Sequence, residues 1–295
     1  MSMGCTKEHE PHNCCADLHT HTTASDGLLS PSELIKKSAA AGLCAVGIAD
    51  HDTIDGIAEA YEASKQYGIE VVPAVELNTR FGKEEIHILG YYIQTDLVWF
   101  KNILSDIRHS RQIRARKMVD NLRRLYGMDI TYEEVEIEAK DGVIARPHIA
   151  RALIKKQLVT DMSEAFAKYI GNNCPAYEPR FRLTTEEGIR VVSEAGGVPV
   201  LAHPGLLSDA GLVNYVIRLG VKGIEVYHSK HTPEQCRRYD QLARKYGLLI
   251  TGGSDYHGYN EAGGVNLGDV KVPYDVVDKL KKFAAESEKN IINKA

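Results

Sequence analysis

The sequence has no long apolar run. Nowhere do about 18 apolar residues follow one another, so no membrane-spanning helix is expected. The beginning of the chain also lacks the apolar core of a signal peptide, which favours a cytoplasmic location. The net charge is −4 and the sequence pI is about 6.3, so the chain as a whole does not attract nucleic acid. Any nucleotide binding must therefore come from charge concentrated at one place.

Cysteine is scarce, and its spacing suggests no cross-link. The six cysteines include no CxxC pair. They lie singly or within apolar runs, which favours reduced thiols in the core over disulfides. For the neighbouring Cys14 and Cys15 we expect a packing role. Residues 1–12 are expected to form a disordered lead whose histidines bind no ligand.

Among the residues that are present, the stretch Asp17-Leu18-His19-Thr20-His21 is the most informative. Side chains two positions apart in a strand point to the same face, so His19 and His21 present two imidazoles side by side. Two neutral imidazoles on one face can form half of a transition-metal site. An isolated pair of this kind could equally be two surface histidines at a strand end.

The pair is not isolated, because further acidic and histidine residues follow in short motifs, most of them where other apolar runs end. They are Asp26, Asp50, His51, Asp52, Glu76, His87, His203, Asp255 and His257. We expect the apolar runs to be buried strands, one ending at Glu76 and another near His87. The sequence therefore indicates a multinuclear metal centre.

Helical segments alternate with these apolar runs. Three of them begin with a capping serine or threonine followed three residues later by glutamate or glutamine: Ser30 with Glu33, Thr184 with Glu187, and Thr232 with Gln235. Alternating strands and helices predict an α/β barrel or a doubly wound sheet. In a barrel, catalytic groups gather at the C-terminal ends of the strands, which is where most of the polar residues stand.

The alternation stops in the middle of the chain. Apolar positions at helical spacing predict a helix over 97–126 that ends at Gly127, and shorter helices over 132–139, 147–156 and 163–170. The first of these helices is rich in arginine and lysine, which is typical of a solvated basic face.

This helical region divides the chain. We expect a helical cap subdomain over residues 97–183, inserted at the catalytic mouth of a barrel domain formed by residues 13–96 and 184–295. A cap in that position would carry substrate specificity, while the barrel would carry the metals.

Together the motifs DLHTH, SDG, ADHD, IHILGY, AHP and GSDYHG resemble those of the PHP (polymerase and histidinol phosphatase) superfamily of metal-dependent phosphoesterases. The similarity spans residues 16–92 and 196–271. It implies the PHP fold, a distorted TIM-like (β/α)7 barrel of the α/β class. The segment Arg146-Pro147-His148-Ile149-Ala150 and the basic helix before it resemble one branch, the nucleoside 3′,5′-bisphosphate phosphatases, some of which also trim RNA from its 5′ end.

The resemblance implies two to three divalent ions, Mn, Fe or Zn. The first would be held by His19, His21, Glu76 and Asp255, the second by Glu76, His87 and His203, and the third by Asp26, His51 and His257. Glu76 would bridge the first two ions, and the expected catalytic residues are Glu76, Asp255 and His203. Relatives carry histidine at the position of Asp26, so the third site is expected to be harder in character.

Other polar residues surround these expected ligands. Three aspartates are expected to accept hydrogen bonds from imidazole N–H groups: Asp17, Asp50 and Asp52. For substrate binding the resemblance indicates Arg146 and His148, since a guanidinium can hold phosphate through two hydrogen bonds. His228, at a strand end, is a further substrate-binding candidate, although a surface role fits the sequence equally well. Without the resemblance, Arg146-Pro147-His148 could simply start a helix.

The implied reaction is hydrolysis of the 3′-phosphate of a nucleoside 3′,5′-bisphosphate, or of a related nucleotide, by a metal-bound hydroxide. The expected partner is a phosphorylated small molecule, a nucleotide, with short RNA as a further substrate. No membrane and no obligate protein partner are implied. Three alternatives stay open: a histidinol phosphate phosphatase with a compact site, a metal-binding PHP module without catalysis, and C–N hydrolysis at a related metal centre.

Overall fold

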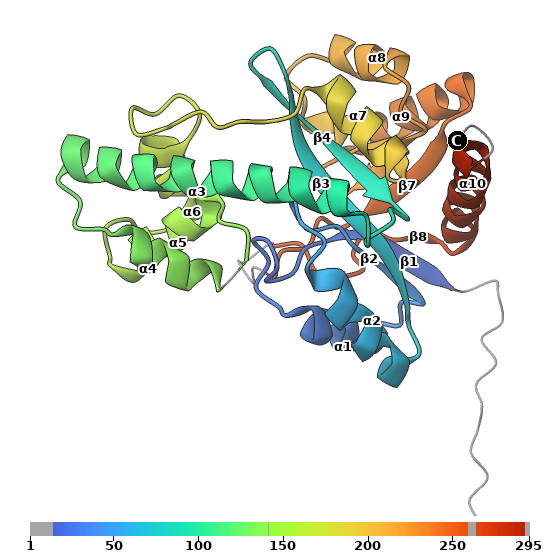
Figure 1. Ribbon diagram of the computed structural model, residues 1–295, viewed down its shortest axis with the longest axis horizontal. Coiled ribbons are helices and arrows are strands. Elements are labelled where there is room, and N and C mark those ends of the chain that lie inside the picture. Colours follow the sequence, from blue (N-terminus) through green and yellow to red (C-terminus); the bar gives the residue numbers. More distant parts are fainter. Residues whose placement is uncertain (1–13, 141, 259–263, 293–295) are drawn as a thin grey trace, which may run out of the picture.

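A computed structural model describes residues 14–140, 142–258 and 264–292, so the expected disordered lead over 1–12 lies outside the described residues. An eight-stranded sheet with the order β7-β6-β5-β4-β3-β2-β1-β8 forms its centre (Figure 1). The strands are β1 (Cys15–Thr20), β2 (Ala45–Ile48), β3 (Glu70–Phe81), β4 (Glu84–Tyr91), β5 (Val198–Leu201), β6 (Gly223–His228), β7 (Leu249–Gly253) and β8 (Val272–Pro273).

The sheet curls until its two sides nearly meet. After β7 the chain runs along the end of β1, where the Asp255 amide donates to the His19 carbonyl (2.8 Å) and the His21 amide donates to the Tyr256 carbonyl (2.9 Å). A Cβ at Gly253 would lie 2.4 Å from the His19 nitrogen, so only glycine permits this close approach. The predicted distorted α/β barrel is confirmed.

One pair of strands departs from the predicted alternation. β3 continues past Glu76, turns at Gly82 with φ +59°, and passes directly into β4, which pairs antiparallel with both β3 and β5. The prediction that strands end at Glu76 and near His87 is therefore wrong, because both residues lie within strands. The polar Asn78 is buried on the interior of the barrel, so it continues the strand instead of marking a turn.

Helices cover the outside of the barrel, and the three helix starts that the sequence predicted are confirmed. They are α1 (Pro31–Ala40), α2 (Gly56–Tyr67), α7 (Thr185–Glu194), α8 (Gly211–Arg218), α9 (Pro233–Tyr246) and α10 (Asp275–Ile292), with a short 3-10 helix η2 (Pro204–Leu206). Complete capping boxes begin α1 at Ser30, α7 at Thr184 and α9 at Thr232. Among the described helices, none combines the length and the apolar character that crossing a membrane requires.

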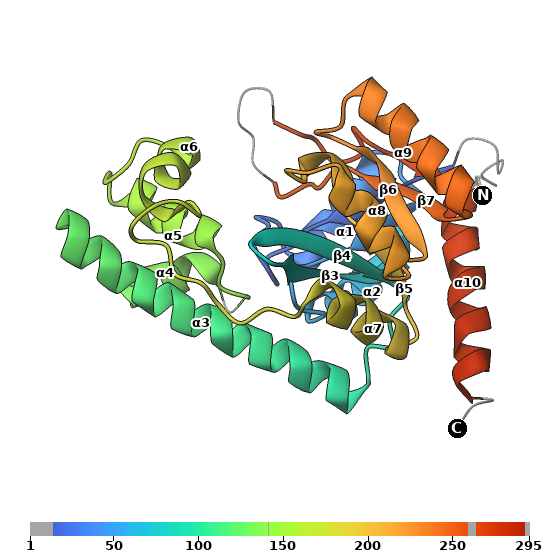
Figure 2. The ribbon, with the colours of Figure 1, turned by 90° about the horizontal axis from the view of Figure 1, so that it is seen from above.

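A helical lobe stands beside the barrel, on the side away from α10 (Figures 1 and 2). It consists of α3 (Val98–Tyr126), α4 (Tyr132–Ala139), α5 (Arg146–Lys155), α6 (Met162–Ala165) and the π-helix η1 (Phe166–Ile170), which confirms the predicted helices to within a residue or two. Gly127 ends α3 in the left-handed conformation, φ +64°.

Helix α3 belongs to two hydrophobic cores. Near its start, Phe100 and Ile107 pack into the core of the barrel, whereas Met118 and Leu122 pack into a separate core within the lobe. A single continuous helix therefore fixes the lobe to the barrel. The predicted subdomain boundaries at 97 and 183 stay a prediction.

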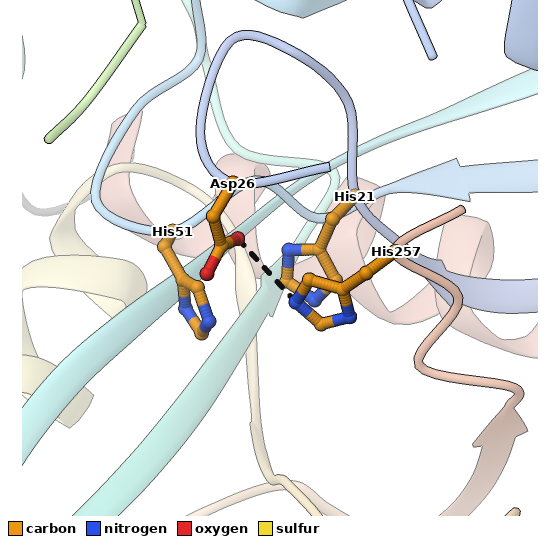
Figure 3. A group of neighbouring side chains, drawn as sticks. All are labelled: His21, Asp26, His51 and His257. Atoms are coloured by element: carbon orange, nitrogen blue, oxygen red, sulfur yellow. Dashed lines mark ion pairs between the residues drawn. The ribbon is translucent and has the colours of Figure 1, made fainter. Parts of the chain in front are cut away.

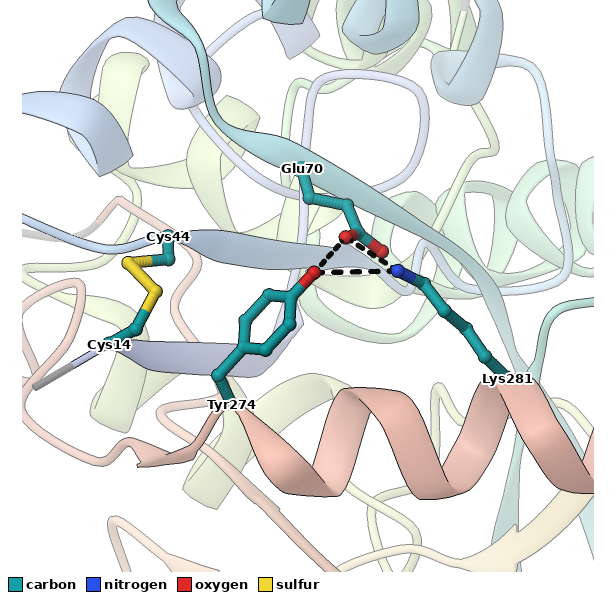
Figure 4. The surroundings of a disulfide bond; sticks show 5 residues. All are labelled: Cys14, Cys44, Glu70, Tyr274 and Lys281. Atoms are coloured by element: carbon teal, nitrogen blue, oxygen red, sulfur yellow. Dashed lines mark hydrogen bonds and ion pairs between the residues drawn. A yellow bond between two sulfur atoms is a disulfide. The ribbon is translucent and has the colours of Figure 1, made fainter. Parts of the chain in front are cut away.

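The expectation that all cysteines are reduced is wrong for one pair. Cys14 and Cys44 form a disulfide (Figure 4). They precede the neighbouring parallel strands β1 and β2, and this register brings their Cα atoms to 5.7 Å, a normal bridging distance. Their separation of 30 residues along the chain hid this proximity in the sequence. Beside the bridge, Glu70 accepts hydrogen bonds from Tyr274 and Lys281, which fastens α10 to β3 (Figure 4).

Candidate metal centre and arginine pocket

Glu76 lies fully buried in the mouth of the barrel, and one of its carboxylate oxygens faces three imidazoles. Oε2 lies 2.9 Å from His51 Nδ1, 3.3 Å from His19 Nε2 and 3.4 Å from His21 Nε2. His19 and His21 are both buried and come from the end of β1, as the alternation of strand side chains predicted. One oxygen thus gathers histidines from two separate motifs.

The second oxygen of Glu76 faces two further imidazoles. Oε1 lies 2.7 Å from His87 Nδ1 and 2.9 Å from His203 Nε2. Burial raises the pKa of the Glu76 carboxyl, but His51, His19 and His87 outweigh burial and hold that pKa well below its usual range. A buried carboxylate with imidazoles on both oxygens has the arrangement of a bridging ligand.

The β3–β4 hairpin accounts for the position of His87. Asn78 is paired opposite His87 across the two antiparallel strands. Because Glu76 is two residues before Asn78, Glu76 and His87 are diagonal neighbours on the same face of the sheet. Both side chains therefore reach the mouth of the barrel from within their strands.

Asp255 extends the cluster on the other side. Its Oδ1 lies 3.1 Å from His21 Nε2 and 3.6 Å from His19 Nε2, and its Oδ2 lies 3.3 Å from His228 Nε2. Burial raises the pKa of Asp255, but His19 and His257 outweigh it and hold that pKa well below its usual range. His228 is buried here against Asp255.

Two of the expected catalytic residues have strained backbones. His203 has φ +25° and Asp255 has φ +57°, although neither is glycine. Residues held in such conformations concentrate at functional sites, where surrounding contacts enforce them. For His203 one such contact is its amide, which donates to Glu225 Oε2 at 2.7 Å.

A third group lies at the edge of the mouth (Figure 3). His21, Asp26, His51 and His257 each offer one ligand atom, and these atoms all lie within 4.8 Å of one another. The carboxylate Oδ1 of Asp26 lies 3.3 Å from His257 Nε2. The structure thus brings together all nine residues expected to bind metal, which we call the histidine–carboxylate cluster: His19, His21, Asp26, His51, Glu76, His87, His203, Asp255 and His257.

The cluster fits divalent metal ions. Several of its buried atoms lie close to one another but form no properly oriented hydrogen bond among the described residues: His19 Nε2, His21 Nδ1, His51 Nδ1 and Glu76 Oε2. Buried polar atoms are rarely left unpaired, because their desolvation is then uncompensated. Imidazole nitrogens and carboxylate oxygens in this mixture are ligands for first-row transition metals. The cluster therefore has the donor atoms that a divalent-metal site requires.

Glu225 is a member of the site that the sequence interpretation missed. It is fully buried at the middle of β6, and its Oε1 lies 3.0 Å from His19 Nδ1. Burial raises the pKa of Glu225, but His19 outweighs it and the pKa is lowered. The signal was present in the sequence, since a lone carboxylate interrupts the apolar strand Gly223–His228.

The expected role of three neighbouring aspartates is wrong. Asp17, Asp50 and Asp52 accept no hydrogen bond from an imidazole ring within the described chain. Asp17 accepts from the amide and hydroxyl of Ser254, and Asp50 accepts from the amide and hydroxyl of Thr22. Asp17 therefore fixes the backbone that follows β7, and Asp50 fixes the backbone that follows β1, both at the mouth of the barrel.

Five guanidinium groups gather next to the histidine–carboxylate cluster, and we call them the arginine cluster: Arg111, Arg114, Arg146, Arg180 and Arg182. Within the described residues, two carboxylates form ion pairs with them. Asp52 Oδ2 accepts from Arg111 Nη2 (2.5 Å) and Arg180 Nη2 (3.2 Å). Glu85 Oε2 lies 2.9 Å from Arg182 Nη2. Positive charge is thus in excess.

Arg114 carries the clearest sign of that excess. It is 4% exposed, it forms no ion pair within the described chain, and its buried Nε has no hydrogen-bond partner there. Burial, followed by repulsion from Arg111 and Arg180, holds the pKa of Arg114 well below its usual range. The interpretation of the α3 basic residues as a solvated face is therefore wrong for Arg111 and Arg114, both of which are buried.

A cavity of about 170 Å³ joins the two clusters. The barrel lines it with Asp26, His51, Asn78, Glu85 and His87, and the lobe and the segment after it line it with Arg111, Arg114, Ala145, Arg146, Pro147, Phe166 and Arg180. Asn78 connects the two walls, because its Nδ2 lies 2.7 Å from His87 Nε2 and its Oδ1 accepts from Arg111 Nη2 at 2.5 Å. We call this cavity the arginine pocket.

The two residues expected to bind substrate in the lobe have different surroundings. Arg146 lines the arginine pocket, and its Nη1 donates to Asn172 Oδ1 at 2.6 Å. His148 is buried, and its Nδ1 accepts from the Ala145 amide at 2.8 Å, which caps the start of α5. Burial, followed by the charge of Arg151, lowers the pKa of His148 to about 3. A substrate role for His148 stays a prediction.

Known proteins resemble this chain over most of its length. The PHP domain family matches residues 17–173, more than half of the chain. The 5′-3′ exoribonuclease of Haemophilus influenzae is 32% identical over 268 residues, covering 87% of this chain and 96% of the relative. The 3′,5′-nucleoside bisphosphate phosphatase of Chromobacterium violaceum is 32% identical over 253 residues, covering 84% of this chain and 88% of the relative.

A solved structure shows the same architecture. A protein from Bifidobacterium adolescentis described as a metal-dependent phosphoesterase has a TM-score of 0.85 and 32% identity, covering 93% of this chain and 98% of that protein. The barrel fold, the donor atoms of the histidine–carboxylate cluster and these similarities agree. The chain belongs to the PHP family and is a metal-dependent phosphoesterase.

Proposed function

We propose that the enzyme removes the 3′-phosphate from nucleoside 3′,5′-bisphosphates and leaves the nucleoside 5′-monophosphate. The observation that carries this proposal is the arginine pocket, which has metal-binding histidines on one wall and unneutralised guanidinium groups on the other. A substrate with two separated phosphates has the matching charge pattern. The name of the Chromobacterium violaceum relative supports the same substrate class.

The expected ligands would hold two to three divalent ions, Mn, Fe or Zn, because mixed imidazole and carboxylate ligation suits these metals. His19, His21, Glu76 and Asp255 would hold one ion, Glu76, His87 and His203 a second, and Asp26, His51 and His257 a third. Ions bound there lower the pKa of water and neutralise charge on phosphoryl oxygens. Glu76, Asp255 and His203 would be the central catalytic group.

A buried carboxylate outside the cluster, Glu225, orients two of the expected metal ligands. His19 Nδ1 lies 3.0 Å from Glu225 Oε1, so a His19 that binds metal through Nε2, on the side of Glu76, would donate its Nδ1 proton to Glu225. The same Glu225 holds the His203 amide through its other oxygen. Glu225 thereby orients two expected ligands of different ions.

The arginine cluster would bind the second phosphate, the one on the 5′-oxygen of the nucleoside. Arg114 and Arg146 face the pocket without a close carboxylate partner, since Glu85 lies 4.0 Å from Arg146 Nη2. Asp52 orients Arg111 and Arg180 around them. A doubly charged phosphate would offset the surplus of positive charge, and guanidinium groups can grip it through paired hydrogen bonds. The helical lobe would then act as the specificity cap.

The same charge argues against the alternatives. Histidinol phosphate carries one phosphate and a cationic ammonium group, and the ammonium would meet the arginine cluster. A metal-binding module without catalysis would have no need of a complete ligand set together with a phosphate-sized pocket.

The test compares phosphate release from adenosine 3′,5′-bisphosphate and from histidinol phosphate by the metal-loaded enzyme. We expect the bisphosphate to have the higher kcat/KM, and Arg114→Met to reduce it by about ten- to a hundred-fold, the worth of one charge-assisted contact. Arg123→Met, at an exposed position of the same helix, is the matched control. Faster turnover of histidinol phosphate, or no phosphate release from either compound, would overturn the proposal.

A further inference from the structure

The segment that carries Asp26 lies between the barrel and the helical lobe. It comprises residues 22–27, after β1, and we call it the Asp26 turn. The Ser25 amide donates to the Thr22 carbonyl at 3.1 Å, which closes the turn on itself. From the barrel, Asp50 accepts hydrogen bonds from the Thr22 amide at 2.7 Å and from the Ser25 hydroxyl at 2.6 Å. These bonds fix the side of the turn that faces the barrel.

Two donors of the lobe hold the other side of the Asp26 turn. The Val143 amide, between α4 and α5, donates to the Ala24 carbonyl at 2.9 Å. On α5, Arg151 Nη1 donates to the Asp26 carbonyl at 3.2 Å, and Arg151 Nη2 donates to the Glu138 carbonyl at 3.3 Å. One guanidinium thus connects the backbone of an expected metal ligand to the last turn of α4.

The lobe packs directly on the Asp26 turn. A Cβ at Gly142 would lie 2.3 Å from the Thr23 carbonyl oxygen, so only glycine permits this close approach. His148 is buried on the same side of the lobe. Burial and the charge of Arg151 lower the pKa of its ring, and the carboxylate of Asp26 opposes them, so the ring lies close to that carboxylate. The lobe and the turn are therefore fixed relative to each other.

The charge of Arg151 would by itself oppose metal binding. Asp26 shares the third group with His51 and His257, and its Oδ1 lies 3.3 Å from His257 Nε2. A guanidinium beside this group repels any cation bound there. Arg151 meets the backbone of Asp26 and leaves the carboxylate directed at the two imidazoles. Any benefit of Arg151 to the site must therefore come from position and not from charge.

We propose that Arg151 is a positioning residue for the third ion, because it holds the Asp26 turn so that the Asp26 carboxylate stays directed at His51 and His257. This proposal rests on the proposed function, since it requires an ion bound by those three ligands. The lobe is then a part of the metal site as well as the specificity cap. Helix α5 serves both roles, because Arg146 at its start lines the arginine pocket.

Titration of the metal-free enzyme with Mn²⁺, followed by the electron paramagnetic resonance of free Mn²⁺, tests the proposal. Asp26→Asn is the reference variant, because it weakens the third ion through the ligand itself. We expect Arg151→Met to weaken that same binding step by about tenfold, the lower end of the range for residues behind metal ligands, and to leave the other steps unchanged. Lys155→Met is the matched control, because Lys155 is a cation of the same helix that contacts the side chain of Glu138 and not the turn.

The direction of the change separates position from charge. Loss of a positive charge near the cluster would by itself tighten the binding of a cation. Arg151→Lys keeps the charge and a donor, so we expect it to bind the third ion more tightly than Arg151→Met. The double variant Asp26→Asn/Arg151→Met should bind Mn²⁺ no more weakly than Asp26→Asn, since Arg151 acts through Asp26.

Unchanged or tighter Mn²⁺ binding by Arg151→Met would overturn this proposal, and so would losses that add in the double variant. Both results leave the proposed function intact, provided that the wild type releases phosphate from adenosine 3′,5′-bisphosphate in the same preparations. A wild type whose Mn²⁺ binding does not respond to Asp26→Asn would overturn this proposal together with the third ion. No phosphate release by the metal-loaded wild type would overturn the proposed function itself, whatever the Mn²⁺ titration shows.

Discussion

The mouth of the barrel and the helical lobe line one cavity with different kinds of charged group. In the barrel, Glu76 and Asp255 lie among imidazoles, and carboxylate oxygens with imidazole nitrogens are donor atoms that suit bound cations. In the lobe, Arg114 and its neighbours outnumber Asp52 and Glu85, so the buried charge is positive and suits an anion. Both regions leave buried polar atoms unpaired within the described chain. This difference fits the proposed function, in which metal ions complete the first region and a phosphate completes the second.

The two regions also differ in how they hold their side chains. The barrel uses strand ends and strained backbone, as at His203 and Asp255. In the lobe, the regular helix α3 presents Arg111 and Arg114 toward the barrel. The two residues are three positions apart, so they lie on the same face of the helix. The barrel site therefore depends on an unusual backbone geometry that few substitutions would preserve. In the lobe, substitutions on the helix can change substrate specificity without changing the backbone.

The largest effect is expected at the centre of the barrel. Glu76→Gln removes the negative charge between five imidazoles and should weaken metal binding and phosphatase activity more than about 100-fold, since even residues behind metal ligands are worth about 10- to 100-fold. The protein should remain folded, because the side-chain shape is retained. Metal content by elemental analysis and turnover of an aryl phosphate provide the measurement. Near-full turnover with ordinary metal content would show that the multinuclear assignment is wrong.

A change in the lobe should separate specificity from chemistry. Arg146→Ala should lower kcat/KM for a nucleoside 3′,5′-bisphosphate by about 10- to 100-fold, because one guanidinium–phosphate contact is lost. Turnover of a simple aryl phosphate should be unchanged, since that substrate makes no contact with the arginine cluster.

Arg146→Lys is the control, because it keeps the charge and loses the planar fork. Equal losses on both substrates would mean that Arg146 supports the fold through Asn172 or the metal site through Glu85. No loss on either substrate would mean that Arg146 does not contribute to substrate binding.

A subtler effect should appear at a residue behind the barrel ligands. Glu225→Gln preserves the size of the side chain but weakens its hold on His19 Nδ1 and on the His203 amide. Metal affinity should fall by about 10-fold, the lower end of the range for such partners. Titration of the metal-free protein with Mn²⁺ measures this directly. Unchanged metal affinity together with reduced turnover would instead mean that Glu225 contributes to the reaction and not to metal binding.

The barrel half of the site could be predicted from sequence because its ligands stand in short motifs. His19 and His21 share a strand face by their spacing, and Asp255 with His257 follows a clear apolar run. The strand ends then brought distant motifs together. Glu225 was missed because it lies in the middle of a strand, away from the strand ends where ligands were expected. Its contact with His19 becomes visible only in the folded structure.

The lobe half could not be predicted in the same way. A basic residue on an amphipathic helix is usually solvated, and nothing local distinguishes Arg114 from the exposed Arg123. The distinction arises because α3 crosses the mouth of the barrel, where Asp52 meets Arg111 across 59 positions of the chain. Asp52 was assigned to an imidazole for the same reason, since its partner lies on an element whose position only the fold determines.

The smallest effect on activity is expected at the disulfide, which lies at the opposite end of β1 from the histidines. Cys44→Ser should leave phosphatase activity unchanged, because neither cluster contacts the bridge. It should nevertheless lower the free energy of unfolding by about 2–4 kcal/mol, the usual worth of a cross-link, since the closed loop of about 30 residues regains freedom in the unfolded chain. Thermal unfolding with and without a reductant measures this. Cys15→Ser is the control, because Cys15 is a free thiol in the adjacent position. A wild-type melting temperature that does not respond to reductant would mean that the bridge does not form in solution.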